Sequence, residues 1–210
     1  MQMVKKIETK NTIQNIIKIF LVLILFSLMP SIAFSQNSPL EVVKITVDKI
    51  IVAVETYPSK EETDIRRKTI RKIIEPAFNF EAMAKLSLGH NWKDTNETEQ
   101  KEYVALFSDL LATTYLKKID LIKKDTVIFK GHRERQDQAL VKTDINYNND
   151  QFPIVYKMRK ELDGKWRVHD ISIENISLVS NYRSEFAGIV RKDGIAGLIE
   201  QLKNKVKKEE

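Results

Sequence analysis

The spacing of the apolar residues changes twice along this chain, and that change limits the folds it can adopt. Between residues 39 and 119 they recur every three or four positions, as on amphipathic helices. Between about 127 and 173 they alternate with polar residues, as on strands that are buried on one face. The helical spacing then returns. Helices, an antiparallel meander and further helices predict an α+β fold, with a curved sheet of about four strands covered on one face.

Prolines, glycines and capping residues divide the helical parts. Asn79 is a candidate N-cap and Gly89 a candidate end of one helix, while Asn96 and Glu99 have the spacing of a capping box. The predicted helices are 39–57, 60–75, 79–89, 97–119, 176–190 and 194–206.

The alternating part contains two turn signals and one irregularity. "NND" at 148–150 and "DG" at 163–164 predict tight connections between neighbouring strands. Trp166 and Val168 occupy even positions, whereas Ile171 and Ile173 occupy odd ones. One extra residue would return all four side chains to one face, so we predict a β-bulge near His169 and Asp170.

The first 35 residues differ from the rest. Four lysines precede an apolar run, and Ala33-Phe34-Ser35 offers small residues at a cleavage site. This pattern predicts a secretory signal peptide over 1–35, a single domain over 36–210 and a periplasmic location.

The chain has no cysteine, which excludes disulfides, thiolate ligands and a lipoprotein anchor. Residues 1–35 also carry half of the net charge of +6, so the remainder is too weakly basic to indicate nucleic-acid binding.

Catalysis is only weakly indicated. His169 and Asp170 lie close to several serines, but neighbouring residues on a strand point to opposite faces, and a base must touch the acid that orients it. The three histidines have no further ligand at metal-binding spacing. We expect no enzymatic activity, metal or cofactor, although an enzyme that uses His169 and Asp170 stays open as an alternative.

One side of the predicted sheet is rich in apolar and aromatic residues. The pattern favours ordinary core there, and it leaves open a ligand cavity under the helices. A protein-interaction module with a filled core is therefore a further alternative.

Three segments together resemble a known family: "IIEPAFNFEAMAKLSLGHNW", "TEQKEYVALFSDLLATTYLKKI" and "DGKWRVHDISIENISLVSNYRSEF". Their order and spacing are similar to those of the MlaC or toluene-tolerance family, the periplasmic phospholipid-binding components of the Mla system. The resemblance covers roughly residues 40–205. Asn175 departs from it, since relatives commonly carry glycine there, but asparagine tolerates the left-handed conformation better than most residues.

The resemblance implies an apolar pocket and a phospholipid carrier. Its partners would be an outer-membrane lipoprotein–porin complex and the periplasmic substrate-binding ring of an inner-membrane ABC transporter. Its role would be to maintain outer-membrane lipid asymmetry.

Candidate residues follow from combining the resemblance with the predicted elements. Ser177 is expected to cap the helix predicted at 176–190, and Arg183 to lie at the mouth of the pocket near the lipid headgroup. An ordinary surface salt bridge is the alternative for Arg183. The expected acyl-chain contacts are Met83, Leu86, Leu110, Tyr115, Phe129, Val141, Ile145, Tyr147, Ile154, Tyr156, Met158, Trp166, Val168, Val179, Tyr182 and Phe186.

Overall fold

The computed structural model describes residues 38–119, 122 and 124–209, so the expected signal peptide lies outside the described residues. The predicted helices are confirmed, with ends that differ by up to three residues. The α-helices are α2 (Pro39–Thr56), α3 (Thr63–Ile74), α4 (Phe80–Leu88), α5 (Glu97–Ile119) and α6 (Leu178–Glu209). Short 3₁₀ helices are η1 (Glu75–Ala77), η2 (Gly89–Asp94) and η3 (Lys124–Thr126).

Local polar contacts set the helix boundaries, as the sequence predicts. Asn79 accepts a hydrogen bond from the Ala82 amide at 2.8 Å. Asn96 and Glu99 exchange reciprocal side-chain-to-backbone bonds at the start of α5, which confirms the capping box. Helix α6 covers both predicted C-terminal segments and is interrupted at Gly194, where φ is 71°.

The strands form one antiparallel meander in the order β1-β2-β3-β4-β5. The described sheet has a fifth strand of two residues that the sequence did not predict. Asn148 and Asn149 both have positive φ in the two-residue turn between β2 and β3, which is the geometry of a type I′ hairpin. The strands are β1 (Val127–Arg135), β2 (Gln138–Tyr147), β3 (Asp150–Lys160), β4 (Trp166–Ile173) and β5 (Ile176–Ser177).

The predicted bulge in β4 is confirmed. Met158 pairs with Val168, and the preceding Lys157 pairs with Asp170, so His169 is the extra residue. Beyond it, the buried side chains of Asp170 and Ser172 turn to the outer face of the sheet. The tight turn to β5 then uses positive φ at Glu174 and Asn175, which fits the expectation that Asn175 can replace a glycine.

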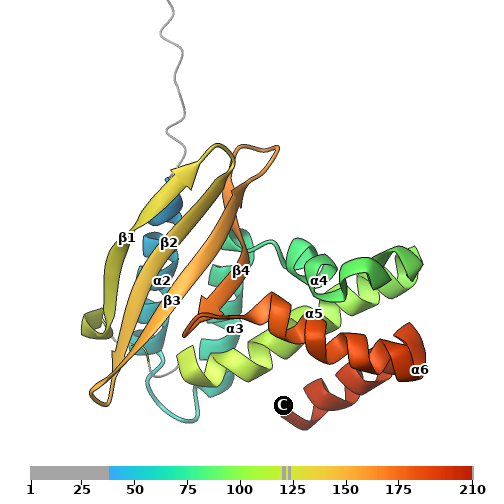
Figure 1. The fold of residues 1–210 in the computed structure, drawn as a ribbon. Coiled ribbons are helices and arrows are strands. Elements are labelled where there is room, and N and C mark those ends of the chain that lie inside the picture. The colour runs from blue at the N-terminus through green and yellow to red at the C-terminus, as the bar shows by residue number, and fades with distance from the viewer. Residues whose placement is uncertain (1–37, 120–121, 123, 210) are drawn as a thin grey trace, which may run out of the picture. The chain divides into compact units, whose positions relative to one another are not determined.

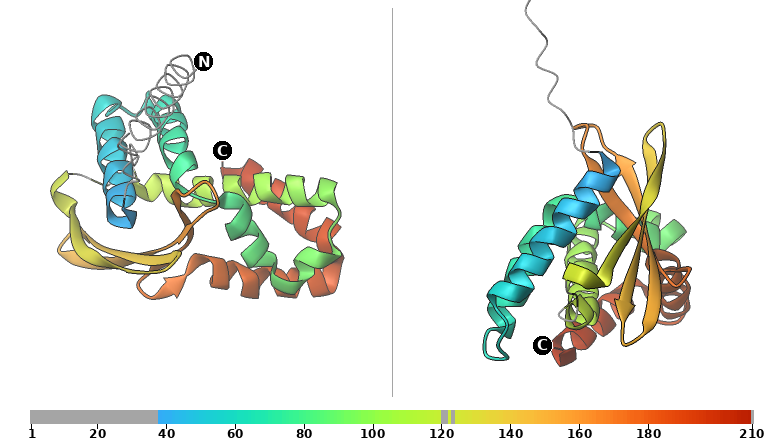
Figure 2. Two further views of the ribbon diagram at one scale, coloured as in Figure 1. Left: turned by 90° about the horizontal axis from the view of Figure 1, so that it is seen from above. Right: turned by 90° about the vertical axis from the view of Figure 1, so that its left-hand side faces the viewer.

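The helices form two groups beside the curved sheet. Helices α2 and α3 and the C-terminal half of α5 lie over its inner face, while α4, α6 and the rest of α5 form a helical layer at the β4 side (Figures 1 and 2). None of the helices in the described part of the chain combines the length and apolar character of a membrane span.

The buried side chains form separate clusters in these two regions. A helical cluster joins α4, α5 and α6 around Tyr103, Phe107 and Phe186. A sheet cluster joins α2 to β2, β3 and β4, and a smaller cluster joins α2 to α3. Buried side chains of α2 therefore pack against part of the inner face of the sheet.

Asp170 joins the bulge to the start of α6. Its carboxylate accepts hydrogen bonds from Lys157 Nζ at 2.7 Å, from the Ser177 hydroxyl at 2.7 Å and from the Val179 amide at 3.2 Å. Ser177 in turn accepts from the Ser180 amide at 3.1 Å, which confirms its predicted capping role. One buried carboxylate thus holds strand β4, strand β3 and helix α6 together.

We predict that Asp170→Asn lowers the free energy of unfolding by about 1–3 kcal/mol, because it removes a buried charged acceptor shared by three donors. Urea denaturation measures the change. Asp48→Asn, which alters an exposed carboxylate on α2, is the matched control and should have little effect. Equal midpoints for Asp170→Asn and the unchanged protein would contradict this role.

Candidate functional site

A cavity of about 480 Å³ lies between the inner face of the sheet and helices α2, α3 and α5. Its size falls within the range of roughly 300–1,000 Å³ that is typical of ligand pockets. Apolar and aromatic side chains form nearly all of its wall. The cavity can therefore accept a large apolar group.

The sheet wall depends on strand alternation and on the bulge. Alternate residues of β3 point inward, namely Phe152, Ile154 and Tyr156. On β4, Val168 lies before the bulge and Ile171 after it, yet both line the cavity. If β4 alternated regularly through His169, without a bulge, Asp170 would face the cavity and Ile171 would not.

The helix wall is a stripe along α5 and one side of α2. Ser108, Ala112 and Tyr115 line the cavity at three- and four-residue spacing, which places them on one face of α5. Thr46 and Ile50 lie on the facing side of α2. Helical periodicity therefore accounts for this wall once the helices are in place.

The connection between α3 and α4 closes another side. Phe78 and Phe80 both line the cavity, and their rings stack with centroids 5.7 Å apart. The Asn79 amide between them donates to the Val168 carbonyl at 2.9 Å. This backbone bond attaches the two aromatic residues to strand β4.

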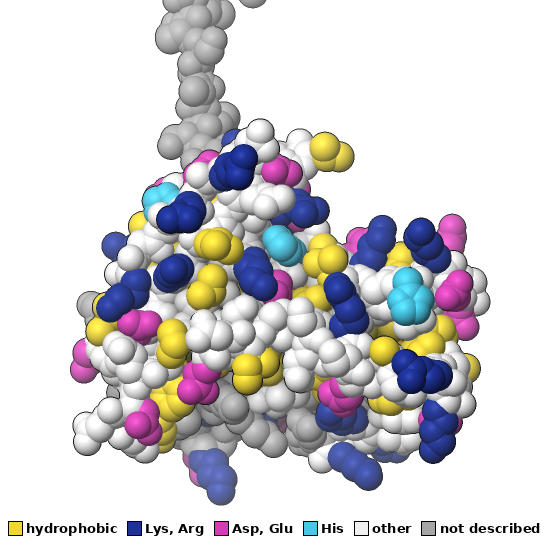
Figure 3. Space-filling view, in the orientation of Figure 1, with side chains coloured by type: hydrophobic (Ala, Val, Ile, Leu, Met, Phe, Trp, Pro, Cys, Tyr) yellow, Lys and Arg dark blue, Asp and Glu magenta, His cyan; other side chains and the backbone are white. Residues whose placement is uncertain are grey.

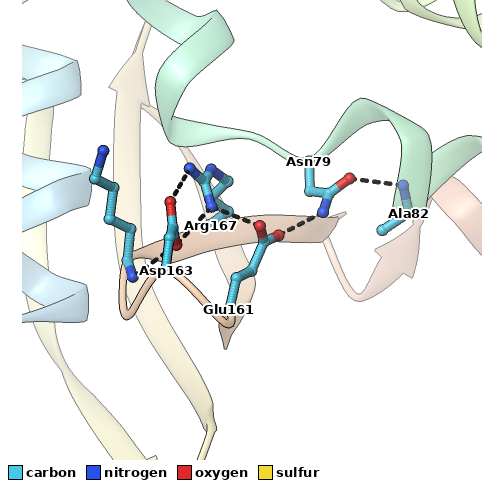
Figure 4. A network of polar contacts seen from close by, with 6 residues as sticks. Asn79, Ala82, Glu161, Asp163 and Arg167 are labelled. Atoms are coloured by element: carbon cyan, nitrogen blue, oxygen red, sulfur yellow. Dashed lines mark hydrogen bonds and ion pairs between the residues drawn. The ribbon is translucent and has the colours of Figure 1, made fainter.

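A polar network strengthens that attachment (Figure 4). The Asn79 side chain donates to Glu161, which also contacts Arg167. Arg167 binds Asp163 in the β3–β4 turn at 2.7 Å, and this hydrogen bond is the main cause, with the Lys165 amide adding to it, that lowers the pKa of Asp163 to about 2. The network therefore links the start of α4 to the β3–β4 hairpin beside the cavity.

The two faces of the sheet differ in chemistry. Lysine and arginine side chains gather on the outer face (Figure 3). Two acidic side chains there are buried and paired: Asp144 contacts Lys130 at 3.2 Å and Asp170 contacts Lys157 at 2.7 Å. Charge is thus concentrated on the side of the sheet opposite to the cavity.

The cavity wall includes two charged side chains among the described residues, Arg71 from α3 and Glu174 from the β4–β5 turn. Both residues are exposed as well as lining the cavity. Arg71 forms an ion pair with Asp109 of α5. These positions mark places where the apolar interior meets solvent.

The structure brings together some of the predicted contact residues and places the others elsewhere. Those that line the cavity are Met83, Tyr115, Ile145, Tyr147, Ile154, Tyr156 and Val168. Eight others belong to or pack against the buried clusters and do not line the cavity: Leu110, Phe129, Val141, Met158, Trp166, Val179, Tyr182 and Phe186. Leu86 is 38% exposed and does not line the cavity.

The apolar stripe of α6 packs against helices instead of closing over the sheet. Phe107 of α5 meets both Tyr182 and Phe186 edge-on, with ring centroids 5.5 and 6.2 Å apart. Leu178, the first residue of α6, is the part of this helix that reaches the cavity wall. Periodicity shows which side of a helix is buried, but it does not show which element covers that side.

Arg183 also lies away from the cavity wall. Its Nε donates to the Leu86 carbonyl at 2.7 Å, and its aliphatic part lies close to Gly89 at the end of α4. The guanidinium therefore ties α6 to α4. Arg71 has the position at the cavity edge that the sequence analysis expected for Arg183.

Sequence reasoning missed most of the helix wall, including Val42, Val47, Ile74, Leu111 and Ile119. Their three- and four-residue spacing was a visible signal of burial. That signal is the same for a residue in filled core and for one beside an empty space. Arg71 carried no signal, because a cation in a charged helix is ordinary.

The His169–Asp170 pair does not form a catalytic arrangement with serine. The Ser177 hydroxyl donates to Asp170, so the serine contacts the acid and not a base. Burial is the main cause that lowers the pKa of His169, with Arg159 adding to it. No group of metal-binding side chains is present among the described residues.

The fold and cavity define a class: α+β proteins in which a curved antiparallel sheet and overlying helices enclose an apolar space of ligand size. Residues 44–204 match the family model described as MlaC protein, and the chain belongs to this family.

Two known proteins are similar over most of their length. The intermembrane phospholipid transport system binding protein MlaC of Haemophilus influenzae is 23% identical over 177 residues, which cover 81% of this chain and 83% of that protein. A phospholipid-binding protein from Ralstonia solanacearum, solved in complex with a phospholipid, is 22% identical, with a TM-score of 0.74. The match covers 82% of this chain and 98% of that one, and it shows a shared fold.

We predict that Ala112→Phe changes the free energy of unfolding by less than about 1 kcal/mol, because the added ring enters empty space. Ala84→Phe places the same ring in the helical cluster, where Ala84 is fully buried, and should cost about 1–3 kcal/mol or more through overpacking. Urea denaturation compares the two variants. A loss as large for Ala112→Phe as for Ala84→Phe would contradict an open cavity at this wall.

Proposed function

We propose that this protein binds a phospholipid in the cavity and carries it as a soluble complex. The observation that carries the proposal is the large, almost wholly apolar wall between the sheet and helices α2, α3 and α5. Membership of the MlaC family and the phospholipid-binding character of both similar proteins support a phospholipid as the cargo. The acyl chains would contact Met83, Tyr115, Ile145, Tyr147, Ile154, Tyr156 and Val168, together with the helix wall.

Burial of the chains determines how such a carrier must work. Each methylene removed from water contributes about 0.8 kcal/mol, so some thirty methylenes contribute roughly 20 kcal/mol. A lipid held in this way escapes into water extremely slowly. Efficient delivery therefore requires a partner that offers the chains another apolar environment.

The proposed setting is the periplasm, reached through the signal peptide expected at residues 1–35. The proposed partners are an outer-membrane lipoprotein–porin complex and the substrate-binding ring of an inner-membrane ABC transporter. Transfer between them would maintain outer-membrane lipid asymmetry. No step of this proposal uses catalysis, and the Asp170 carboxylate is already occupied by three donors at a helix start.

We expect the purified protein to show a stoichiometric phospholipid adduct in native mass spectrometry, and organic extraction of the same sample to identify it. Ala112→Phe should retain less lipid because the ring occupies the cavity. Leu86→Phe, at an exposed position outside the cavity wall, is the control and should retain as much as the unchanged protein. If the unchanged protein stays free of lipid even after incubation with liposomes, the carrier proposal fails and a protein-interaction module becomes the better explanation.

We also expect transfer of a fluorescent phospholipid from this protein to acceptor liposomes to be slow and to accelerate by orders of magnitude when the membrane-anchored partner ring is present. The reason is that the partner replaces the passage through water. Stopped-flow fluorescence measures both rates. Equal rates with and without the partner would show that docking is not needed for release.

A further inference from the structure

Arg71 combines two properties that no other described basic residue has. It lines the apolar cavity, and its side chain is also 48% exposed to solvent. The guanidinium therefore lies on the boundary where a polar group attached to buried chains would emerge. Position alone makes Arg71 a candidate for contact with that polar group.

The partner of Arg71 is suited to exchange. Arg71 Nη2 contacts Asp109 Oδ1, and the Asp109 side chain is itself 33% exposed. An ion pair that is open to water on both sides contributes little to stability, because solvent screens the charges. A guanidinium also has five N–H donors in a planar fork, which suits bidentate binding of phosphate.

The surroundings favour an anion that is attached to apolar chains over a free anion in water. Low-dielectric walls strengthen the attraction between the guanidinium and an anion held at the cavity edge. An anion joined to apolar chains is brought to this edge by the burial of those chains. Arg71 can then give a charge-assisted hydrogen bond without having to capture the anion from solution.

We propose that Arg71 is the binding site for the phosphodiester of the cargo, and that Asp109 is the counter-ion that the phosphate displaces. This inference rests on the proposed function, since it assumes that acyl chains occupy the cavity. The protein would recognise the phosphate of the headgroup, and not the alcohol beyond it. Arg71 would thereby distinguish phospholipids from uncharged lipids with the same chains.

The test is a competition for the delipidated protein. Phosphatidylglycerol and diacylglycerol with identical acyl chains are offered together in equal amounts in mixed micelles, and the bound ratio is measured by extraction and mass spectrometry. The unchanged protein is compared with Arg71→Gln and Asp109→Asn. Arg191→Gln removes an exposed arginine of α6 that does not line the cavity, and it is the matched control.

We expect Arg71→Gln to reduce the preference for phosphatidylglycerol by roughly tenfold, the size of one charge-assisted hydrogen bond. Asp109→Asn removes the competing anion and should keep or increase the preference, and Arg191→Gln should leave it unchanged. Arg71→Gln and Asp109→Asn both break the same ion pair. If the pair were merely structural, both would shift the ratio in the same direction, and that result would overturn the inference.

Two further outcomes separate the possible failures. If the unchanged protein retains neither lipid, the proposed function fails. If phosphatidylglycerol is retained but Arg71→Gln leaves the bound ratio of phosphatidylglycerol to diacylglycerol unaltered, only the role of Arg71 is overturned. Inorganic phosphate is added in a last arm. Loss of the preference at millimolar inorganic phosphate would mean that Arg71 binds free phosphate, and the assignment to a lipid headgroup would be wrong.

Discussion

The bulge at His169 is the constraint on which the rest of the structure depends. A strand that kept its register would turn Asp170 toward the cavity and Ile171 away from it. With one extra residue, β4 presents apolar side chains inward along its whole length. The same residue sends Asp170 to the outer face, where its carboxylate binds Lys157, Ser177 and the start of α6. One local irregularity therefore creates both the apolar wall and the polar connection to the helical layer.

Different groups of side chains stabilise the fold and enclose the binding space. The helical cluster around Phe107 and Phe186 is buried between α4, α5 and α6, and a second cluster joins α2 to the sheet. The cavity borders both clusters, because Met83 of the first and Val47 and Val168 of the second also line it, so buried side chains support its wall. Side chains beside an empty space lose contacts that filled core would provide. A ligand with apolar chains restores those contacts, which is why the cavity suits an amphiphile better than a small polar molecule.

Charge is arranged in keeping with this division. Cations on the outer face of the sheet surround two buried acids that are each paired with a lysine (Figure 3). At the cavity edge, Arg71 and Asp109 form a pair that water reaches from both sides. The buried Asp170 and the partly exposed Asp109 therefore differ in role. The first is held in place by three donors, whereas the second can release its partner to a phosphate.

Local patterns in the sequence determined the helices, the hairpin turns, the caps at Asn79 and Ser177 and the bulge, because each depends on residues close together in the chain. The alternation of β2, β3 and β4 also identified most of the sheet wall. Only the tertiary structure decided which buried stripe faces which neighbour. Phe186 and Arg183 pack toward α4 and α5, while Ala112 and Arg71 face the cavity, and their spacing is equally helical. Periodicity measures burial, but a cavity is a property of the distance between elements, which no single helix or strand encodes.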